Sequence, residues 1–243
     1  MHPRIIVVLP AYNAATTLKS VYRRLPKTLV DEIILVDDGS QDSTVAVAKK
    51  LGITTFVHKI NRGYGANQKT CYREALKRQA DFIIMLHPDS QYDPKDLSKF
   101  IQVFKTRKAD LVLGSRFLAG GDKKTPLYKS ISIRIITLLF NLVLGTHLSE
   151  ANTGYRGFSR GLLQSVPWHK NGNSYIFDPQ MIIQAHHFGF KIVDVPIFKD
   201  YHSAASSPNF AKSLHHGLEN LQLLVEYLLH QFRLKSADFL VKP

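Results

Sequence analysis

The sequence predicts an α/β fold in which helices flank a mostly parallel central sheet. Short apolar runs bounded by turn residues alternate with amphipathic stretches through the first half of the chain, as in repeated βα units. Polar or acidic residues follow several of these runs, where the carboxyl ends of parallel strands open into a ligand-binding crevice. With 243 residues, of which 44% are hydrophobic and 21% charged, the chain can bury one substantial core.

The predicted elements follow from these runs in chain order. Strands are expected over residues 4–9, 32–36, 54–58, 81–86, 110–114 and 192–197. Helices are expected over residues 17–25, 43–51, 66–78, 94–107, 129–144, 178–188 and 210–232. The segment Asp42-Ser43-Thr44 supplies an N-cap for the second helix, and Pro94 suits the first position of the fourth. We expect residues 1–200 to form the main domain and residues 201–243 an amphipathic helical extension packed on or beside it.

The net charge of +13 indicates an anionic partner, and its distribution is local. Residues 95–134 contain ten Lys or Arg against three Asp or Glu, so +7 of the +13 lies in this stretch. Nucleic-acid-binding motifs are missing and aromatic residues are not interleaved with the basic run, so no nucleic-acid partner is expected. The single cysteine, Cys71, excludes a disulfide framework and a multi-cysteine zinc site.

The apolar segments predict a protein that lies on a membrane surface without crossing it. Met1 is followed by a strand-like run, so we expect no signal peptide and a cytoplasmic location. Arg134 and Asn141 interrupt the most apolar stretch, which leaves it shorter than a spanning helix requires. The basic stretch leading into the helix 129–144 favours an interfacial helix beside anionic lipid, with a core helix as the alternative. The leucine stripe of 210–232 favours packing on the sheet over docking to a membrane or partner.

Three segments at strand ends carry polar groups suited to a ligand. The first is Leu9–Asn13, directly after the first predicted strand. The second holds Asp37 and Asp38, whose mutual repulsion predicts a metal, a ligand hydroxyl or a base donor nearby, with an Asx turn plus helix cap as the alternative. The third is the glycine-rich loop 61–67, which leads into a helix and offers backbone N–H groups to an anion.

The fourth predicted strand ends in a possible metal-ligand set. If the chain stays extended, His87, Asp89 and Gln91 lie on one side. An imidazole, a carboxylate and an amide oxygen form a partial shell for Mn²⁺ or Mg²⁺ that leaves positions for diphosphate oxygens. The fifth strand then brings Arg116 to the same rim. We expect Asp37, Asp38 and Asp89 to gather around one cation and one activated donor.

These five segments, in this order, resemble the family-2 glycosyltransferases of GT-A fold, specifically the polyprenyl-phosphate branch of dolichyl-phosphate mannose and glucose synthases. The resemblance runs through residues 4–200. It includes 151–158, which looks like the family's threonine/serine-glycine-aromatic-arginine segment, and 189–197, which looks like its closing strand. It implies a metal-dependent, inverting transfer of a hexose from a GDP- or UDP-sugar to a polyprenyl phosphate.

The resemblance also implies roles for single residues. The donor would contact Pro10, Tyr12, Asn13, Asp37, Asp38, Gly63 and Asp89. The metal would be held by Asp89 and Gln91, with His87 in place of the first acid of the family's usual Asp-x-Asp. Because imidazole is more compatible with Mn²⁺ than with Mg²⁺, we expect Mn²⁺ to be favoured.

A lipid phosphate is already anionic, so its transfer needs cations more than a general base. Arg116, Arg134 and Arg156 are the candidates, and Arg116 is the best of them because a guanidinium fork matches phosphate. Structural charge is the alternative for Arg134 and Arg156. We assign catalysis to Asp89 and Arg116, and treat Glu150 as a positioning residue.

Two other functions stay open at this point. The chain could transfer sugar to a soluble or glycan hydroxyl, or it could be a catalytically weakened subunit of a synthase complex. The second alternative follows from His87 and from Asp200, which stands where the synthases usually carry a basic residue before a serine-rich loop. The sequence leaves open a homo-oligomer or a membrane-anchored partner.

Overall fold

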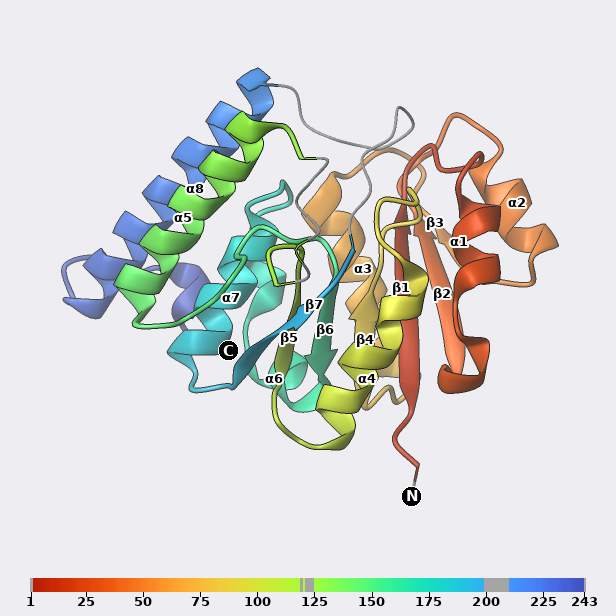
Figure 1. Ribbon diagram of the computed structural model, residues 1–243, viewed down its shortest axis with the longest axis horizontal. Helices are drawn as coiled ribbons and strands as arrows, with labels where there is room; N and C mark the ends of the chain where they lie inside the picture. Colours follow the sequence, from red (N-terminus) through yellow and green to blue (C-terminus); the bar gives the residue numbers. More distant parts are fainter. Residues whose placement is uncertain (1, 119, 121–124, 199–209, 243) are drawn as a thin grey trace.

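The computed structural model describes residues 2–118, 120, 125–198 and 210–242, with the backbone alone for 210–214. Seven strands form one sheet in the order β3-β2-β1-β4-β6-β5-β7 (Figure 1). Their bounds are β1 (Ile5–Ala11), β2 (Glu32–Asp37), β3 (Thr54–Val57), β4 (Phe82–Met85), β5 (Leu111–Ser115), β6 (Arg156–Ser159) and β7 (Ile192–Pro196). Neighbouring strands are parallel except at β6, which runs antiparallel to both β4 and β5.

Helices cover both faces of the sheet. They are α1 (Leu18–Arg24), α2 (Thr44–Lys50), α3 (Tyr64–Lys77), α4 (Leu97–Lys105), α5 (Leu127–Leu144), α6 (Arg160–Ser165), α7 (Phe177–His187) and α8 (Phe210–Gln231). Alternation along β1 sends Ile6 and Val8 into one core and Ile5, Val7 and Leu9 into the other. The prediction of an α/β fold with a mostly parallel sheet is therefore confirmed.

The six predicted strands all form, and β6 is the strand that the sequence analysis missed. Its four residues, Arg-Gly-Phe-Ser, show no apolar run or alternation. The strand is buried because it pairs with β4 on one side and with β5 on the other. A Cβ on Gly157 would lie 2.7 Å from Cε2 of Phe104, so glycine lets α4 pack closely against this strand.

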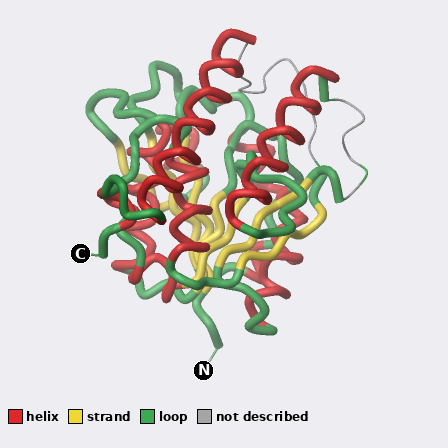
Figure 2. Tube along the Cα trace, turned by 90° about the vertical axis from the view of Figure 1, so that its left-hand side faces the viewer, coloured by secondary structure: helices red, strands yellow, loops and turns green. Residues whose placement is uncertain are grey.

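Helices α5 and α8 lie side by side at one end of the molecule (Figures 1 and 2). By length and composition α5 could cross a membrane, contrary to the expectation that no segment would, and 28% of its 18-residue window is buried. Its outward-facing side chains include Ile131, Ile135, Leu138 and Leu142, all exposed. Leu223, Leu224 and Tyr227 of α8 join the core. The predicted boundary at residue 200 and the loop around Asp200 lie outside the described residues, so the domain division stays a prediction.

Candidate active site

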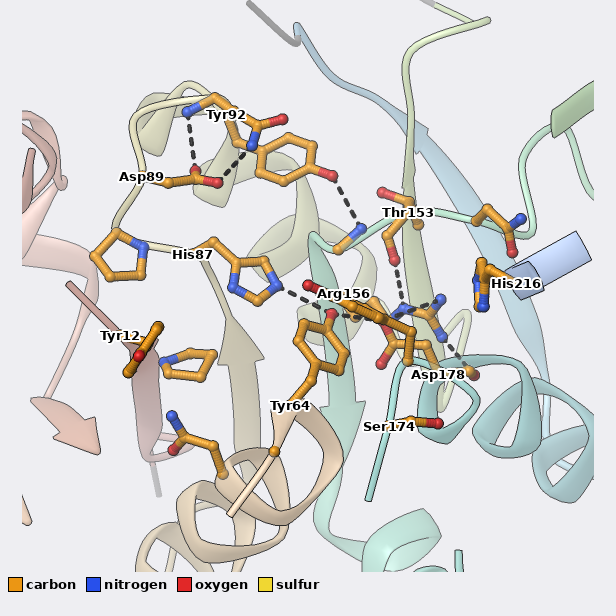
Figure 3. Close-up of a pocket in the computed structure, with 18 of the residues that line it drawn as sticks. Tyr12, Tyr64, His87, Asp89, Tyr92, Thr153, Arg156, Ser174, Asp178 and His216 are labelled. Atoms are coloured by element: carbon orange, nitrogen blue, oxygen red, sulfur yellow. Dashed lines mark hydrogen bonds and ion pairs between the residues drawn. The ribbon is translucent and has the colours of Figure 1, made fainter. Parts of the chain in front are cut away.

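A cavity of about 920 Å³ opens at the carboxyl ends of β1 and β4. The loops after β1, β2, β3 and β4 line one side of it, and residues of α5, α7 and α8 line the other. Figure 3 shows this arrangement, with Tyr12 and Asp89 on one side and Asp178 and His216 on the other. The crevice predicted from the strand ends is therefore present.

The loop after β1 brings Pro10, Tyr12 and Asn13 to the cavity. Tyr12 is 52% exposed, so its ring is available to a ligand. Asn13 takes a left-handed conformation with φ of 51°, which asparagine tolerates better than most residues. The backbone N–H of Asn13 donates to Oγ of Ser40 (2.8 Å), and its Oδ1 accepts from the N–H of Gln41 (2.9 Å), so the loops after β1 and β2 are fastened together.

The two adjacent aspartates have different surroundings. Asp37 is 1% exposed and accepts hydrogen bonds from the backbone and hydroxyl of Ser40, which is the Asx-turn alternative. In the part of the chain that the structure describes, Asp37 is not among the residues that line the cavity. Asp38 does line it. The expectation that Asp37, Asp38 and Asp89 gather around one cation is wrong for Asp37, because its carboxylate closes the turn.

Asp38 orders the glycine-rich loop. Its carboxylate accepts from Nδ1 of His58 (2.6 Å) and from the backbone N–H groups of Arg62 and Gly63 (both 3.0 Å). Gly63 has φ of 96°, and a Cβ there would lie 2.7 Å from the carbonyl oxygen of Asn173. Glycine is therefore required where the loop turns into α3, which begins at Tyr64, two residues earlier than predicted.

The metal-ligand set predicted after β4 is arranged differently from the prediction. The chain is not extended there, because β4 ends at Met85 and Ser90 is left-handed with φ of 62°. This turn folds Gln91 back, so that its backbone N–H and Nε2 donate to the two oxygens of Asp89 (3.1 and 2.6 Å). His87 turns toward Tyr64, whose hydroxyl lies 3.1 Å from Nε2 (Figure 3). All three line the cavity, but strand alternation does not put them on one side.

A polar cluster around Asp178 escaped the sequence analysis. The hydroxyl of Tyr64 donates to Oδ2 of Asp178 (2.7 Å), and Nε2 of Gln68 donates to Oδ1 (2.9 Å). Burial, reinforced by the charge of Asp178, raises the pKa of Tyr64 well above its ordinary value, so this phenol stays protonated. Asp178 opens a predicted helix and Tyr64 lies in the glycine-rich loop, yet no local pattern indicates a contact across 114 residues.

The three predicted phosphate ligands occupy different environments. Arg116 lines the cavity and is 2% exposed. It is ion-paired with Glu150, whose carboxylate accepts hydrogen bonds from Nε (3.1 Å) and from Nη2 of the guanidinium. Arg156 also lines the cavity but is 0% exposed, and its guanidinium donates to three backbone carbonyls. Arg134 is exposed, lies over the ring of Phe117 at 4.2 Å, and is not a lining residue in the described part of the chain.

The wall opposite the strand ends includes residues that the sequence did not single out. Lys129 of α5 and His215, His216 and Glu219 of α8 line the cavity. Burial lowers the pKa of His216. The carboxylate of Glu219, 3.5 Å from Nδ1 of His216, partly offsets this lowering. Helical spacing places these three α8 residues on one side, but the sequence does not say that α8 reaches the site.

Comparison with known proteins assigns this chain to a family. The model of glycosyl transferase family 2 matches residues 6–166, which includes all four loops after β1 to β4. The chain is 27% identical over 211 residues to the UDP-N-acetylglucosamine–dolichyl-phosphate N-acetylglucosaminyltransferase of Methanococcus voltae, covering 79% of this chain and 84% of the relative. It is also 27% identical over 203 residues to the polyprenol monophosphomannose synthase of Mycolicibacterium smegmatis, covering 80% and 76%.

Solved structures agree on the fold. Glucosyl-3-phosphoglycerate synthase from Mycobacterium tuberculosis, in complex with Mg²⁺ and UDP, superposes with a TM-score of 0.70 at 22% identity, covering 97% of this chain and 81% of that one. This likeness extends over both the sheet and the helices beside it. The match to the family model covers well over half of the sequence, and the chain therefore belongs to glycosyl transferase family 2 and is a glycosyltransferase of GT-A-like fold.

Proposed function

We propose that this enzyme transfers a hexose from a nucleoside diphosphate sugar to a polyprenyl phosphate at the cytoplasmic face of a membrane, with inversion at the anomeric carbon. One observation carries the proposal: a single cavity joins the donor-type loops after β1 to β4 to Lys129 on α5, a helix whose outer face is apolar and exposed. The relatives from M. voltae and M. smegmatis are named for transfer to dolichyl phosphate and to a polyprenol phosphate product.

The donor would lie at the carboxyl ends of β1 and β2. Pro10, Tyr12 and Asn13 line this part of the cavity, and Asp38 holds Gly63 at its edge. Asp37 would act on donor binding indirectly, because it holds Ser40, whose hydroxyl oxygen accepts the backbone N–H of Asn13. The M. voltae relative is named for a UDP-sugar and the mycobacterial neighbour binds UDP, which supports testing UDP-sugars first, with GDP-sugars beside them.

The side chains at the end of β4 are suitable ligands for a divalent cation. Asp89 presents a carboxylate and His87 an imidazole, a combination that favours Mn²⁺ over Mg²⁺, and complexes of the neighbouring synthase contain either ion. Within the described residues, no three His, Cys, Asp or Glu side chains form a metal site, so diphosphate oxygens, Gln91 and water would complete the shell. When bound, such a cation stabilises the charge that develops on the leaving diphosphate.

The acceptor phosphate would enter from the α5 side. Its anionic oxygen attacks the anomeric carbon opposite the leaving diphosphate, forming one C–O bond as the other breaks, without a strong general base. Arg116, held by Glu150, and Lys129 supply positive charge in the cavity. Arg156 shapes the wall through its carbonyl contacts, and Arg134, being outside the cavity, would meet lipid headgroups instead.

The membrane contact would be made by α5. Ile131, Ile135, Leu138 and Leu142 are exposed on it, and the exposed Arg134 lies among them along the helix. Apolar side chains with neighbouring basic groups favour the interface of an anionic leaflet. This arrangement would place the cavity mouth near the headgroup of a lipid-linked acceptor.

Transfer assays test the proposal. Purified enzyme is incubated with radiolabelled UDP- or GDP-sugars, Mn²⁺, and either a short polyprenyl phosphate or a soluble glycan. Label in the lipid phosphate, in a β-linked product from an α-linked donor, is expected. Label in the glycan alone would assign a hydroxyl acceptor, and no transfer with any donor would assign a partner subunit; both outcomes contradict the proposal.

A further inference from the structure

His87 belongs to a hydrogen-bonded chain that ends on a buried carboxylate. Nε2 of His87 lies 3.1 Å from the hydroxyl of Tyr64, and that hydroxyl lies 2.7 Å from Oδ2 of Asp178. Asp178 is 8% exposed and receives a second donor, Nε2 of Gln68, at 2.9 Å. In Figure 3 the three side chains follow one another in the order His87, Tyr64, Asp178.

The direction of these hydrogen bonds follows from the groups involved. The Tyr64 hydroxyl has a single proton, and it donates this proton to Oδ2 of Asp178. If the hydroxyl donated to His87 instead, its oxygen would face the Asp178 carboxylate at 2.7 Å with no proton between them. Nε2 of His87 must therefore carry a proton and donate to Tyr64. In a neutral imidazole, the lone pair is then on Nδ1.

Packing fixes which edge of the ring faces the cavity. A Cβ on Gly154 would lie 2.9 Å from Cδ2 and 3.0 Å from Nε2 of His87, so this edge rests on the backbone of residue 154. The ring of Tyr64 stacks against the imidazole with centroids 5.4 Å apart. Nδ1 lies on the opposite edge of the ring, and His87 is one of the residues that line the cavity, two positions before Asp89.

We propose that Tyr64 and Asp178 are positioning residues that hold His87 as its Nε2–H tautomer, so that Nδ1 is the atom that binds the divalent cation together with Asp89. This inference rests on the proposed function. Histidines that bind metals in proteins usually donate their other ring N–H to an acceptor, which fixes the tautomer and makes the binding nitrogen more basic. Here a tyrosine hydroxyl is that acceptor, and a carboxylate polarises it.

Under this proposal, a histidine at position 87 needs supporting residues that an acid at the same position would not need. A carboxylate at residue 87 would need no second group to select its binding atom, whereas an imidazole does. The hydrogen bonds through Tyr64 to Asp178 select Nδ1 as the binding atom of the imidazole. Substitution of Tyr64 by Phe keeps the ring that stacks on His87 and removes only the hydroxyl, so it isolates the selection from the packing.

Pulsed electron paramagnetic resonance of bound Mn²⁺ tests this without any turnover. The 243-residue chain is mixed with Mn²⁺ and UDP, and electron spin-echo modulation reports nitrogen bound directly to the ion. The wild type is expected to show modulation from ¹⁴N that changes when histidine is labelled with ¹⁵N. His87→Ala is expected to abolish it, and Tyr64→Phe to weaken Mn²⁺ binding about ten- to a hundredfold, the range typical of lost outer-shell partners.

Controls keep the outcomes distinct. Tyr22→Phe removes a tyrosine hydroxyl from α1, outside the cavity lining, and is expected to leave the Mn²⁺ affinity unchanged. Urea unfolding of Tyr64→Phe checks that the variant is folded under the conditions of the titration. Mn²⁺–UDP binding without histidine modulation overturns the inference but leaves the proposed function standing, as does unchanged affinity in folded Tyr64→Phe. Failure of the wild type to bind Mn²⁺ and UDP at all overturns the proposed function itself.

Discussion

The carboxylate of Glu150 fixes the guanidinium of Arg116 at the cavity wall. Oε2 of Glu150 accepts from both the backbone N–H (2.9 Å) and Nε (3.1 Å) of Arg116, and the two side chains are 0% and 2% exposed. Such a pair costs desolvation energy for both ions, and its geometry recovers that cost only while both partners are present. Arg116 lines the cavity, and this pair fixes the orientation of its guanidinium.

Removal of Glu150 should destabilise the fold. Glu150→Ala leaves the Arg116 charge buried without its carboxylate, so the free energy of unfolding is expected to fall by about 3–5 kcal/mol. Urea denaturation monitored by circular dichroism measures this. Glu226→Ala, at a half-buried position of α8 away from the cavity lining, is the control and should change stability by less than about 0.5 kcal/mol. Equal stabilities of the two variants would contradict a structural role for the pair.

Asp38 should control nucleotide affinity through the glycine-rich loop. Asp38→Ala leaves the N–H groups of Arg62 and Gly63 without their carboxylate, at a cost of about 1–3 kcal/mol in unfolding free energy. The loosened loop should also weaken UDP binding, measured by isothermal titration calorimetry at a temperature where the variant is folded. Unchanged affinity in the folded variant would show that loop order and donor binding are separate.

Asp89 should affect turnover much more than stability. Asp89→Ala removes a half-buried carboxylate whose hydrogen-bond partner is the neighbouring Gln91, and we expect kcat to fall about 10²–10³-fold. Asp93→Ala is the matched control, because Asp93 lies in the same loop but pairs with Arg24 and caps the turn at Lys95. It should retain kcat. Comparable losses in both variants would indicate that the loop, rather than the Asp89 carboxylate, determines the rate.

Membrane binding should depend on the outer face of α5. The double substitution Ile135→Glu with Leu138→Glu places two charges among exposed apolar side chains, so flotation with vesicles rich in anionic lipid should drop at least about tenfold. Val57→Glu changes an equally exposed apolar residue on β3 and should float like the wild type. If both proteins float alike, the apolar face of α5 is not the membrane contact.

The sequence predicted the strand ends but not the contacts made there. The run Ile5–Ala11 is apolar throughout, and parallel strands buried on both faces have this local pattern. The left-handed turn at Ser90 has no glycine or asparagine to mark it, so extending the strand through Asp89 gave the wrong arrangement of the ligand set.

Charge was visible in the sequence, while its pairing was not. Arg116, Arg134 and Arg156 look alike as isolated cations. Only the fold distinguishes the first, which is paired with the Glu150 carboxylate, from the third, which donates to three backbone carbonyls and lies 3.7 Å from the Asp178 carboxylate. Arg134 is exposed because it lies on the outer face of α5. Helix periodicity alone does not identify which face of α5 meets the core, because most of the helix is apolar.

A cluster of histidines between α7 and the end of α8 predicts acid-sensitive stability. Burial lowers the pKa of His186 and His187 from the ordinary value of 6.5, and the charges of His230 and Lys242 lower that of His187 further. Nδ1 of His187 lies 2.9 Å from Nε2 of Gln231, a donor, so protonation at Nδ1 would break this hydrogen bond. The native state therefore resists a proton that the unfolded chain accepts.

The sign of the pH effect follows from this difference. Below about pH 6.5 the unfolded chain binds more protons than the native state, so the free energy of unfolding falls as the pH drops toward the lowered native pKa values. Urea denaturation at pH 7.5 and 5.5 should show this loss, and His187→Gln should reduce it. The raised pKa of Asp194, caused by burial, acts in the opposite direction but is common to both proteins, so the difference between them isolates His187. An identical loss in the variant would remove His187 as a cause.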